Sequence, residues 1–237
     1  MREQTITLDT PDGPMDLFEA RPDGDARGAV VVIQEAFGVN DYIKAVARNL
    51  AAEGYQAVAP HLFHRTGGGT VPYGEFSKVM EKYQGLDDDA ILRDVDASLD
   101  HPRAAGWPDS RIGIVGFCFG GRVTFLVAAR RRLGAAIGFY GGGIVTARFP
   151  QFPPLVGEAV TLETPWLGLF GDLDQSIPVD DVEQLRSALD DAPVDHEVVR
   201  YANAGHGFHR FVGDDHVPDA ADDAWGRTLG WLAKHLE

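Results

Sequence analysis

The chain has 237 residues, of which 44% are hydrophobic and 24% charged, values that are ordinary for a globular protein. Acidic residues outnumber basic ones by 36 to 21, and the resulting net charge of −15 disfavours binding to nucleic acid or to anionic membranes. No run of 18 apolar residues predicts a membrane span, and the polar first residues lack the apolar stretch of a signal peptide, so we expect a cytoplasmic location. The single cysteine excludes an intrachain disulfide and a zinc site of several thiolates.

The first hundred residues predict a hairpin followed by alternating strands and helices. Residues 4–8 and 15–20 alternate between polar and apolar side chains around a turn at 10–13, which predicts a β-hairpin. The β-branched run 29–33 predicts a strand buried on both faces. The next expected elements are a helix from the Asn40-Asp41 cap to Gly54, a strand at 56–60, a loop at 65–73, and one or two helices within 75–100, broken near residue 85.

The alternation of strands and helices continues to the end of the chain. We expect, in order, a strand at 111–115, a helix at 119–131, a strand at 135–140, an irregular surface excursion at 144–163, a strand at 166–170, a helix at 179–189, a strand at 196–201 and a helix at 219–236. This order predicts a mostly parallel sheet covered by helices on both faces, and the lack of a linker or repeat predicts one α/β domain over residues 1–237. Ligands bind such sheets at the carboxyl ends of the strands.

A candidate nucleophile follows the strand predicted at 111–115. The segment Gly116-Phe117-Cys118-Phe119-Gly120-Gly121 has the glycine–x–nucleophile–x–glycine form of a nucleophile elbow, with cysteine in place of serine. Glycines flank the nucleophile because a Cβ at either position would clash in so sharp a turn, and the N-terminus of the following helix favours the thiolate. The alternative is a buried structural cysteine in a strand–helix turn.

A candidate acid and base follow two later strands. The segment 171–178 contains Asp172 and Asp174; we favour Asp174, at the third position after a glycine, whereas Asp172 could cap a turn. His206 lies in the segment Ala204-Gly205-His206-Gly207-Phe208, directly after the last strand. The chain order of nucleophile, acid and histidine predicts an α/β-hydrolase fold, with Cys118, Asp174 and His206 as a catalytic triad.

Over nearly its whole length the sequence resembles the dienelactone hydrolase family. The segment Gln34-Glu35-Ala36-Phe37-Gly38-Val39-Asn40 looks like the family's Q-E-x-F-G-[VL]-N motif, and the elbow, acid and histidine segments match as well. The resemblance implies a cysteine hydrolase that cleaves a small, dienelactone-type ester or lactone through an acyl-enzyme, without metal or cofactor. It also implies that Glu35 helps to take the thiol proton when substrate binds, which protects a resting thiol from oxidation.

The remaining site residues are expected from position or from the resemblance. The backbone N–H groups of Phe119 and Ala36 are expected to form the oxyanion hole. Arg210, four residues after His206, matches an arginine that binds a substrate carboxylate in the family, and arginine suits a carboxylate because its planar fork pairs with both oxygens. Of the aromatic residues near strand ends, Phe37 and Tyr83 are expected to line the substrate pocket.

One departure from the family's pattern bears on the substrate, and alternative functions remain for the same triad. The best-known family members have a second carboxylate-binding arginine before the helix near residue 77, and here only Lys78 and Lys82 are at hand, which argues against dienelactone itself as the substrate. A thioesterase or general carboxylesterase would use the same triad, and a non-catalytic thiol sensor would need no Asp–His pair. We expect a monomer or homodimer. His61, His64, His206 and His209 lack the spacing of a metal site.

Overall fold

All eight strands of the protein belong to one sheet in a computed structural model, which describes residues 1–211 and 213–236. The strands are β1 (Arg2–Thr10), β2 (Gly13–Arg21), β3 (Ala29–Ile33), β4 (Gln56–Pro60), β5 (Ile112–Phe117), β6 (Ala135–Phe139), β7 (Trp166–Gly171) and β8 (His196–Tyr201). Their order across the sheet is β1-β2-β4-β3-β5-β6-β7-β8. The β1–β2 hairpin and its pairing with β4 are antiparallel, and every pair from β4 to β8 is parallel, as the sequence predicts.

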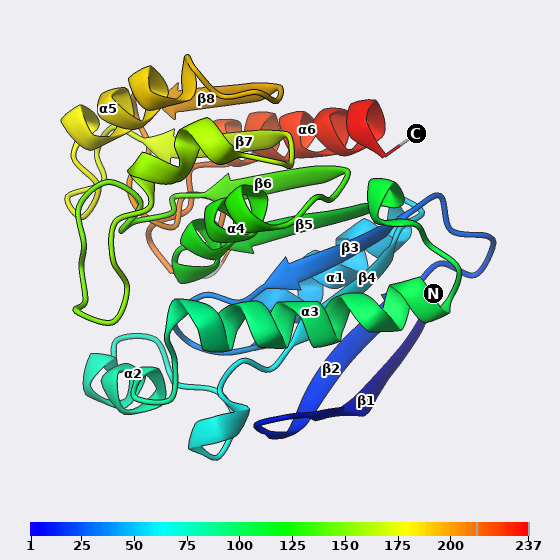
Figure 1. Cartoon of the computed structure of the whole chain (residues 1–237). Helices are drawn as coiled ribbons and strands as arrows, with labels where there is room; N and C mark the ends of the chain where they lie inside the picture. The colour runs from blue at the N-terminus through cyan, green and yellow to red at the C-terminus, as the bar shows by residue number, and fades with distance from the viewer. Residues whose placement is uncertain (212, 237) are drawn as a thin grey trace.

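Helices cover both faces of this sheet. They are α1 (Asp41–Ala52), α2 (Phe76–Tyr83), α3 (Asp88–Ala104), α4 (Phe119–Arg130), α5 (Val179–Leu189) and α6 (Pro218–His235), with short 3-10 helices η1 (His64–Thr66), η2 (Asp109–Arg111) and η3 (Val156–Thr161). Figure 1 shows α3 and α4 in front of the sheet and α1 and α6 behind it. This arrangement confirms the α/β-hydrolase fold. Within the described residues, no helix has the length and apolarity needed to cross a bilayer.

The burial of the central strands explains their apolar sequences. Every residue of β3, β5, β6 and β7 is buried, because helices cover the sheet on both sides there. The outer strand β1 is exposed over its first four residues and reads as an alternating, half-polar segment. The core therefore lies around these four strands, and the candidate site lies at the carboxyl ends of β3, β5, β7 and the neighbouring β8.

The predicted elements and the observed ones differ mainly at their ends. The hairpin strands are longer than predicted, at nine residues each. Residues 75–100 form two helices, and the second begins where the side chain of Asp87 accepts a hydrogen bond from the backbone N–H of Ala90 at 2.7 Å. Strand β5 begins at Ile112, because the residue before it closes a 3-10 turn. The excursion at 144–163 holds one short 3-10 helix, η3.

Candidate active site

Cys118 occupies a strained turn between β5 and α4. Its backbone has φ 55° and ψ −115°, a region that residues with a side chain rarely adopt. A Cβ on Gly116 would lie 2.1 Å from the carbonyl oxygen of Gly120, and a Cβ on Gly120 would lie 2.5 Å from that of Ile33. The turn therefore needs glycine at both positions, for the steric reason that the sequence suggests. It directs Cys118 to the edge of the sheet where the central strands end.

The base candidate His206 is held by Asp174. The Nδ1–H of His206 donates a hydrogen bond to Oδ2 of Asp174 at 2.6 Å, and the carboxylate side chain is only 1% exposed. The other oxygen, Oδ1, accepts hydrogen bonds from the backbone N–H and the hydroxyl of Ser176, at 2.8 and 2.6 Å. Burial raises the pKa of Asp174, but the hydrogen bonds and the charge of His206 outweigh this and hold it below its usual value. Asp174 is thus a fixed carboxylate that orients the imidazole.

The rival acid, Asp172, is engaged elsewhere. Its two carboxylate oxygens accept hydrogen bonds from Nε and Nη2 of Arg200, at 2.7 and 2.9 Å. Arg200 lies on β8 and also contacts Glu183 of α5, so this pair ties the sheet edge to a helix. The geometry therefore gives the histidine to Asp174 and gives Asp172 a bond between secondary-structure elements.

The charge state of His206 depends on its two acidic neighbours. Burial lowers the pKa of this imidazole, yet the negative charge of the Cys118 thiolate and hydrogen bonds to Asp174 and Cys118 raise it to about 10. At neutral pH the ring is therefore protonated when it faces a thiolate. An imidazolium in this position stabilises the thiolate once the thiol has lost its proton.

Glu35 follows β3 and is buried, with contacts to Tyr73 and Arg210. The hydroxyl of Tyr73 donates a hydrogen bond to Oε2 of Glu35 at 2.9 Å, and Nη1 of Arg210 lies 3.8 Å from Oε1. Burial raises the pKa of Glu35, while the Arg210 cation and the Tyr73 hydrogen bond oppose that rise. A raised pKa makes this buried carboxylate a stronger proton acceptor than an exposed glutamate. Arg210 also pairs with Asp215 and lies over the ring of Tyr73, 4.5 Å from its centroid.

A cavity of about 490 Å³ opens beside the thiol. Its lining includes the three triad candidates and Ala36 and Tyr83 from the sequence prediction. The other lining residues are Phe76, Val79, Met80, Arg148, Phe149, Leu173, Gln175, Ser176, Gly205 and Asp215. A smaller hollow of about 50 Å³ adjoins Cys118 and is lined by Phe119 and Tyr83 together with Phe149 and Phe152. The cavity is large enough for a small ester, and its walls are mostly apolar or aromatic.

Three predicted residues take other places. Phe37 is buried edge-on against Tyr73, with ring centroids 4.6 Å apart, and does not line the cavity. Lys82 donates to the carbonyl oxygens of Thr66 and Gly68, at 2.8 Å each, and Lys78 pairs with its neighbour Glu75. Neither lysine therefore supplies a cation to the cavity wall.

Sequence reasoning assigned no specific role to two residues at the site. Arg148 lies in the proline-rich excursion, where no periodicity marks a position as inward-facing. Tyr73 stands out in the sequence only as a loop aromatic, and its contact with Glu35 depends on how the loop before α2 folds.

The histidines considered as metal ligands lie apart from one another. His64 contacts Asp94, and His209 contacts the hydroxyl of Tyr42. Over residues 1–211 and 213–236, no three His, Cys, Asp or Glu side chains gather as a metal site.

Comparison with known proteins decides the family. The sequence model described as "Dienelactone hydrolase family" matches residues 15–236. The chain belongs to the dienelactone hydrolase family. It is therefore a hydrolase, and the resemblance read from the motifs is confirmed.

Relatives of this dienelactone hydrolase family member match most of its length. It is 38% identical over 231 residues to a Salmonella typhimurium protein named "Putative carboxymethylenebutenolidase", covering 93% of this chain and 83% of that one. It is 30% identical over 227 residues to the carboxymethylenebutenolidase of Rhodococcus opacus, covering 94% and 87%. A Klebsiella pneumoniae structure titled "Putative Dienelactone Hydrolase" superposes with a TM-score of 0.90 at 34% identity, covering 98% of both chains.

Proposed function

We propose that this protein hydrolyses a small, anionic ester or lactone of the dienelactone type through a covalent intermediate on Cys118. One observation carries the proposal: Cys118 sits in a strained elbow at the wall of a cavity, beside a histidine whose Nδ1 is fixed by a buried carboxylate. A structural cysteine needs no such partner, and a thiol sensor needs no Asp–His pair.

The proposed reaction has two steps, the acylation of Cys118 and the hydrolysis of the acyl-enzyme. The Cys118 thiolate attacks the carbonyl carbon, and the backbone N–H groups of Phe119 and Ala36 bind the resulting oxyanion. The imidazolium of His206 then gives its proton to the leaving alcohol, which leaves an acyl thioester on the cysteine. His206, neutral at that point, takes a proton from water, whose oxygen attacks the thioester carbonyl. The C–S bond then breaks, which releases the acid product and returns the Cys118 thiolate beside the imidazolium; the thiolate recovers its proton from Glu35 when the product leaves. Asp174 keeps the imidazole in orientation through both steps.

Glu35 and Arg210 are proposed to make thiolate formation depend on substrate. A substrate carboxylate near Arg210 would weaken the contact of that cation with Glu35, which now stands at 3.8 Å. The raised pKa of the buried Glu35 suits it to take the thiol proton at that moment. The thiol would then be activated only with substrate in the cavity, which limits its oxidation.

The experiment that tests this function is steady-state hydrolysis of a panel of esters. The panel is a dienelactone, p-nitrophenyl acetate and butyrate, and an acyl thioester, with Cys118→Ala as control. We expect turnover that the variant loses. Turnover of the dienelactone well above the simple esters would mean that one carboxylate-binding arginine suffices for the family's substrate. Turnover of the thioester or the simple esters alone would keep the triad chemistry and replace the substrate by that of a thioesterase or general carboxylesterase. If Cys118→Ala hydrolyses the panel as well as the unaltered protein, the cysteine mechanism is wrong.

The location and the oligomeric state of the protein are predicted from the sequence alone. A cytoplasmic location and a monomeric or homodimeric state belong to this proposal.

A further inference from the structure

Arg148 stands where three hollows of the site meet. It lines the main cavity beside Cys118 and the smaller aromatic hollow next to Phe119. It also lines a third, neighbouring hollow of about 220 Å³, whose wall includes Ile177 and Val182. Arg148 therefore borders each of the three spaces that the acyl or alcohol part of an ester could occupy.

The charge of Arg148 is unmatched, unlike that of the other arginines near the site. Arg122 is bound at 2.6 and 3.0 Å by the two oxygens of Asp88, and Arg210 pairs with Glu35 and Asp215. Within residues 1–211 and 213–236, no carboxylate oxygen lies within 4.0 Å of a guanidinium nitrogen of Arg148. A guanidinium without a counter-charge, in a protein of net charge −15, is available for an anion from outside.

Contacts place this guanidinium beside the hollow that adjoins Cys118. Nη1 of Arg148 lies 2.8 Å from the point where a Cβ of Gly142 would stand, so the side chain rests on that backbone, and Gly142 shares the aromatic hollow with Cys118. The Tyr83 hydroxyl lies within electrostatic reach of both groups. Burial and then the Cys118 charge raise its pKa well above the usual value, and the Arg148 cation opposes them.

The residues that α2 contributes to the cavity lining carry no charge. In the cavity lining, α2 contributes Phe76, Val79, Met80 and Tyr83, which are apolar or aromatic. An anionic group in the cavity can therefore pair with Arg148 directly, whereas Arg210 would first have to give up its contacts with Glu35 and Asp215.

We propose that Arg148 is a specificity-determining residue that binds a carboxylate on the ester substrate and so gives the enzyme its preference for anionic esters. The proposal rests on the hydrolase function proposed above and deepens it. Arginine suits the role because its planar fork donates two parallel hydrogen bonds to a carboxylate, whereas a lysine offers a point charge. The expected preference is expressed in kcat/KM, because the contact is made before and during the attack by Cys118.

The test compares two esters of the same chain length, mono-p-nitrophenyl glutarate and p-nitrophenyl valerate, which differ by one terminal carboxylate. We expect Arg148→Gln to lower kcat/KM for the glutarate ester roughly 10- to 100-fold, the size of a lost hydrogen bond to a charged group, and to leave the valerate ester nearly unchanged. Arg148→Lys should restore part of the loss, since it keeps the charge without the fork.

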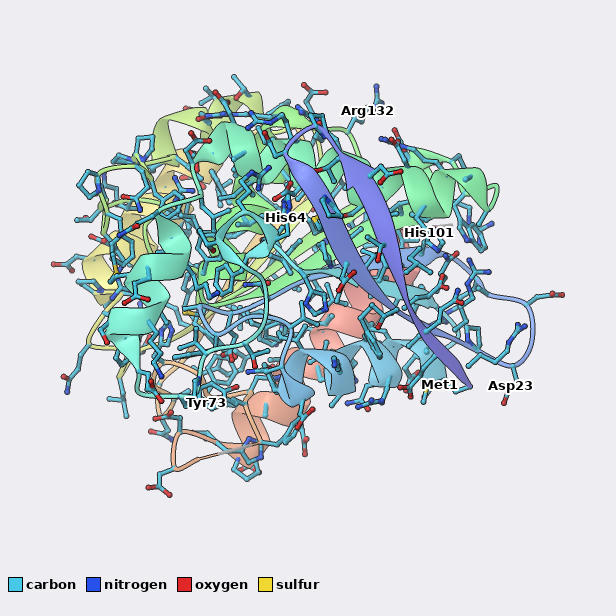
Figure 2. The ribbon with its side chains drawn as sticks, turned by 90° about the horizontal axis from the view of Figure 1, so that it is seen from below. Met1, Asp23, His64, Tyr73, His101 and Arg132 are labelled. Atoms are coloured by element: carbon cyan, nitrogen blue, oxygen red, sulfur yellow. The ribbon has the colours of Figure 1, made fainter. Side chains whose placement is uncertain are left out.

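The matched control is Arg132→Gln. Arg132 is exposed and follows the far end of α4, about 18 Å along the helix from Cys118. Figure 2 shows it far from Tyr73, on the opposite side of the molecule from the loop that covers Glu35. This variant removes the same charge from the protein and should leave both esters unaffected. Equal slowing of both esters by Arg148→Gln, or an effect as large from Arg132→Gln, would overturn the proposal.

A binding measurement separates this proposal from the proposed function. Glutarate, titrated into the unaltered protein and into Arg148→Gln by calorimetry, should bind the first at least tenfold more tightly. Equal affinities would overturn the role of Arg148 even if the esters were turned over. Arg148-dependent binding without Cys118-dependent turnover would keep the anion site and overturn the hydrolase mechanism instead.

Discussion

Replacing Asp174 by asparagine tests the acid of the triad. The amide keeps the shape of the side chain and can still accept hydrogen bonds from Ser176, but it removes the charge 2.6 Å from Nδ1 of His206. Because the Asp174 side chain is only 1% exposed, water cannot take its place in stabilising the charge of the imidazolium. Breaking a buried ion pair by removing one partner costs about 3–5 kcal/mol. Because this cost falls on the imidazolium that the reaction uses, it corresponds to a loss of roughly 150- to 5,000-fold in kcat/KM.

The rival carboxylate provides the matched control. Asp172→Asn makes the same chemical change two residues away, at a side chain that contacts Arg200 rather than the histidine. The assay is kcat/KM for p-nitrophenyl acetate, with circular dichroism to confirm that both variants fold. We expect the loss in Asp174→Asn alone. A loss of similar size in Asp172→Asn, or an Asp174→Asn variant that keeps its activity, would refute the assignment drawn from the geometry.

Two further predictions concern groups beside the triad. Tyr73→Phe removes a donor to Glu35, so the pKa of Glu35 should rise further and the acidic limb of the kcat/KM–pH profile should move up by about one unit; a uniform loss at all pH values would contradict this. Burial lowers the pKa of His209 to about 4 from 6.5, so the unfolded chain binds more protons between these values and stability falls as the pH drops through that window. Urea unfolding at pH 7.5 and 5 should show about 2 kcal/mol more loss in the unaltered protein than in His209→Gln, and equal losses would show that His209 is not the cause.

The sequence predicts the fold well because its signals are local. Each central strand is a short apolar run, and each helix carries apolar residues at helical spacing, so the order of elements follows from the chain alone. The candidate triad is predictable for the same reason, because each of its members directly follows a strand. The motif also favours Asp174 over Asp172 as the acid. In the structure Asp174 contacts His206, whereas Asp172 contacts Arg200.

The parts that sequence reasoning missed depend on segments that meet only in three dimensions. Arg148 is exposed in an irregular stretch, and its place at the cavity results from the packing of that stretch against the elbow, which leaves no periodic signal. Phe37 is absent from the cavity lining and packs edge-on against Tyr73, whose position follows from a loop that no short motif predicts. In both cases the decisive contact joins residues far apart in the chain.

The glycines of the elbow have a consequence for how this enzyme can acquire new substrates. Helix α4 approaches the sheet through backbone, since a Cβ on Gly121 would lie 2.5 Å from the carbonyl oxygen of Phe139, just as one on Gly120 would meet Ile33. Contacts between main-chain atoms cannot be relaxed by choosing another rotamer, so variation there destroys the site instead of reshaping it. New specificity has to come from the adaptable walls, α2 and the excursion that carries Arg148. Libraries meant to redirect the enzyme should be confined to those walls.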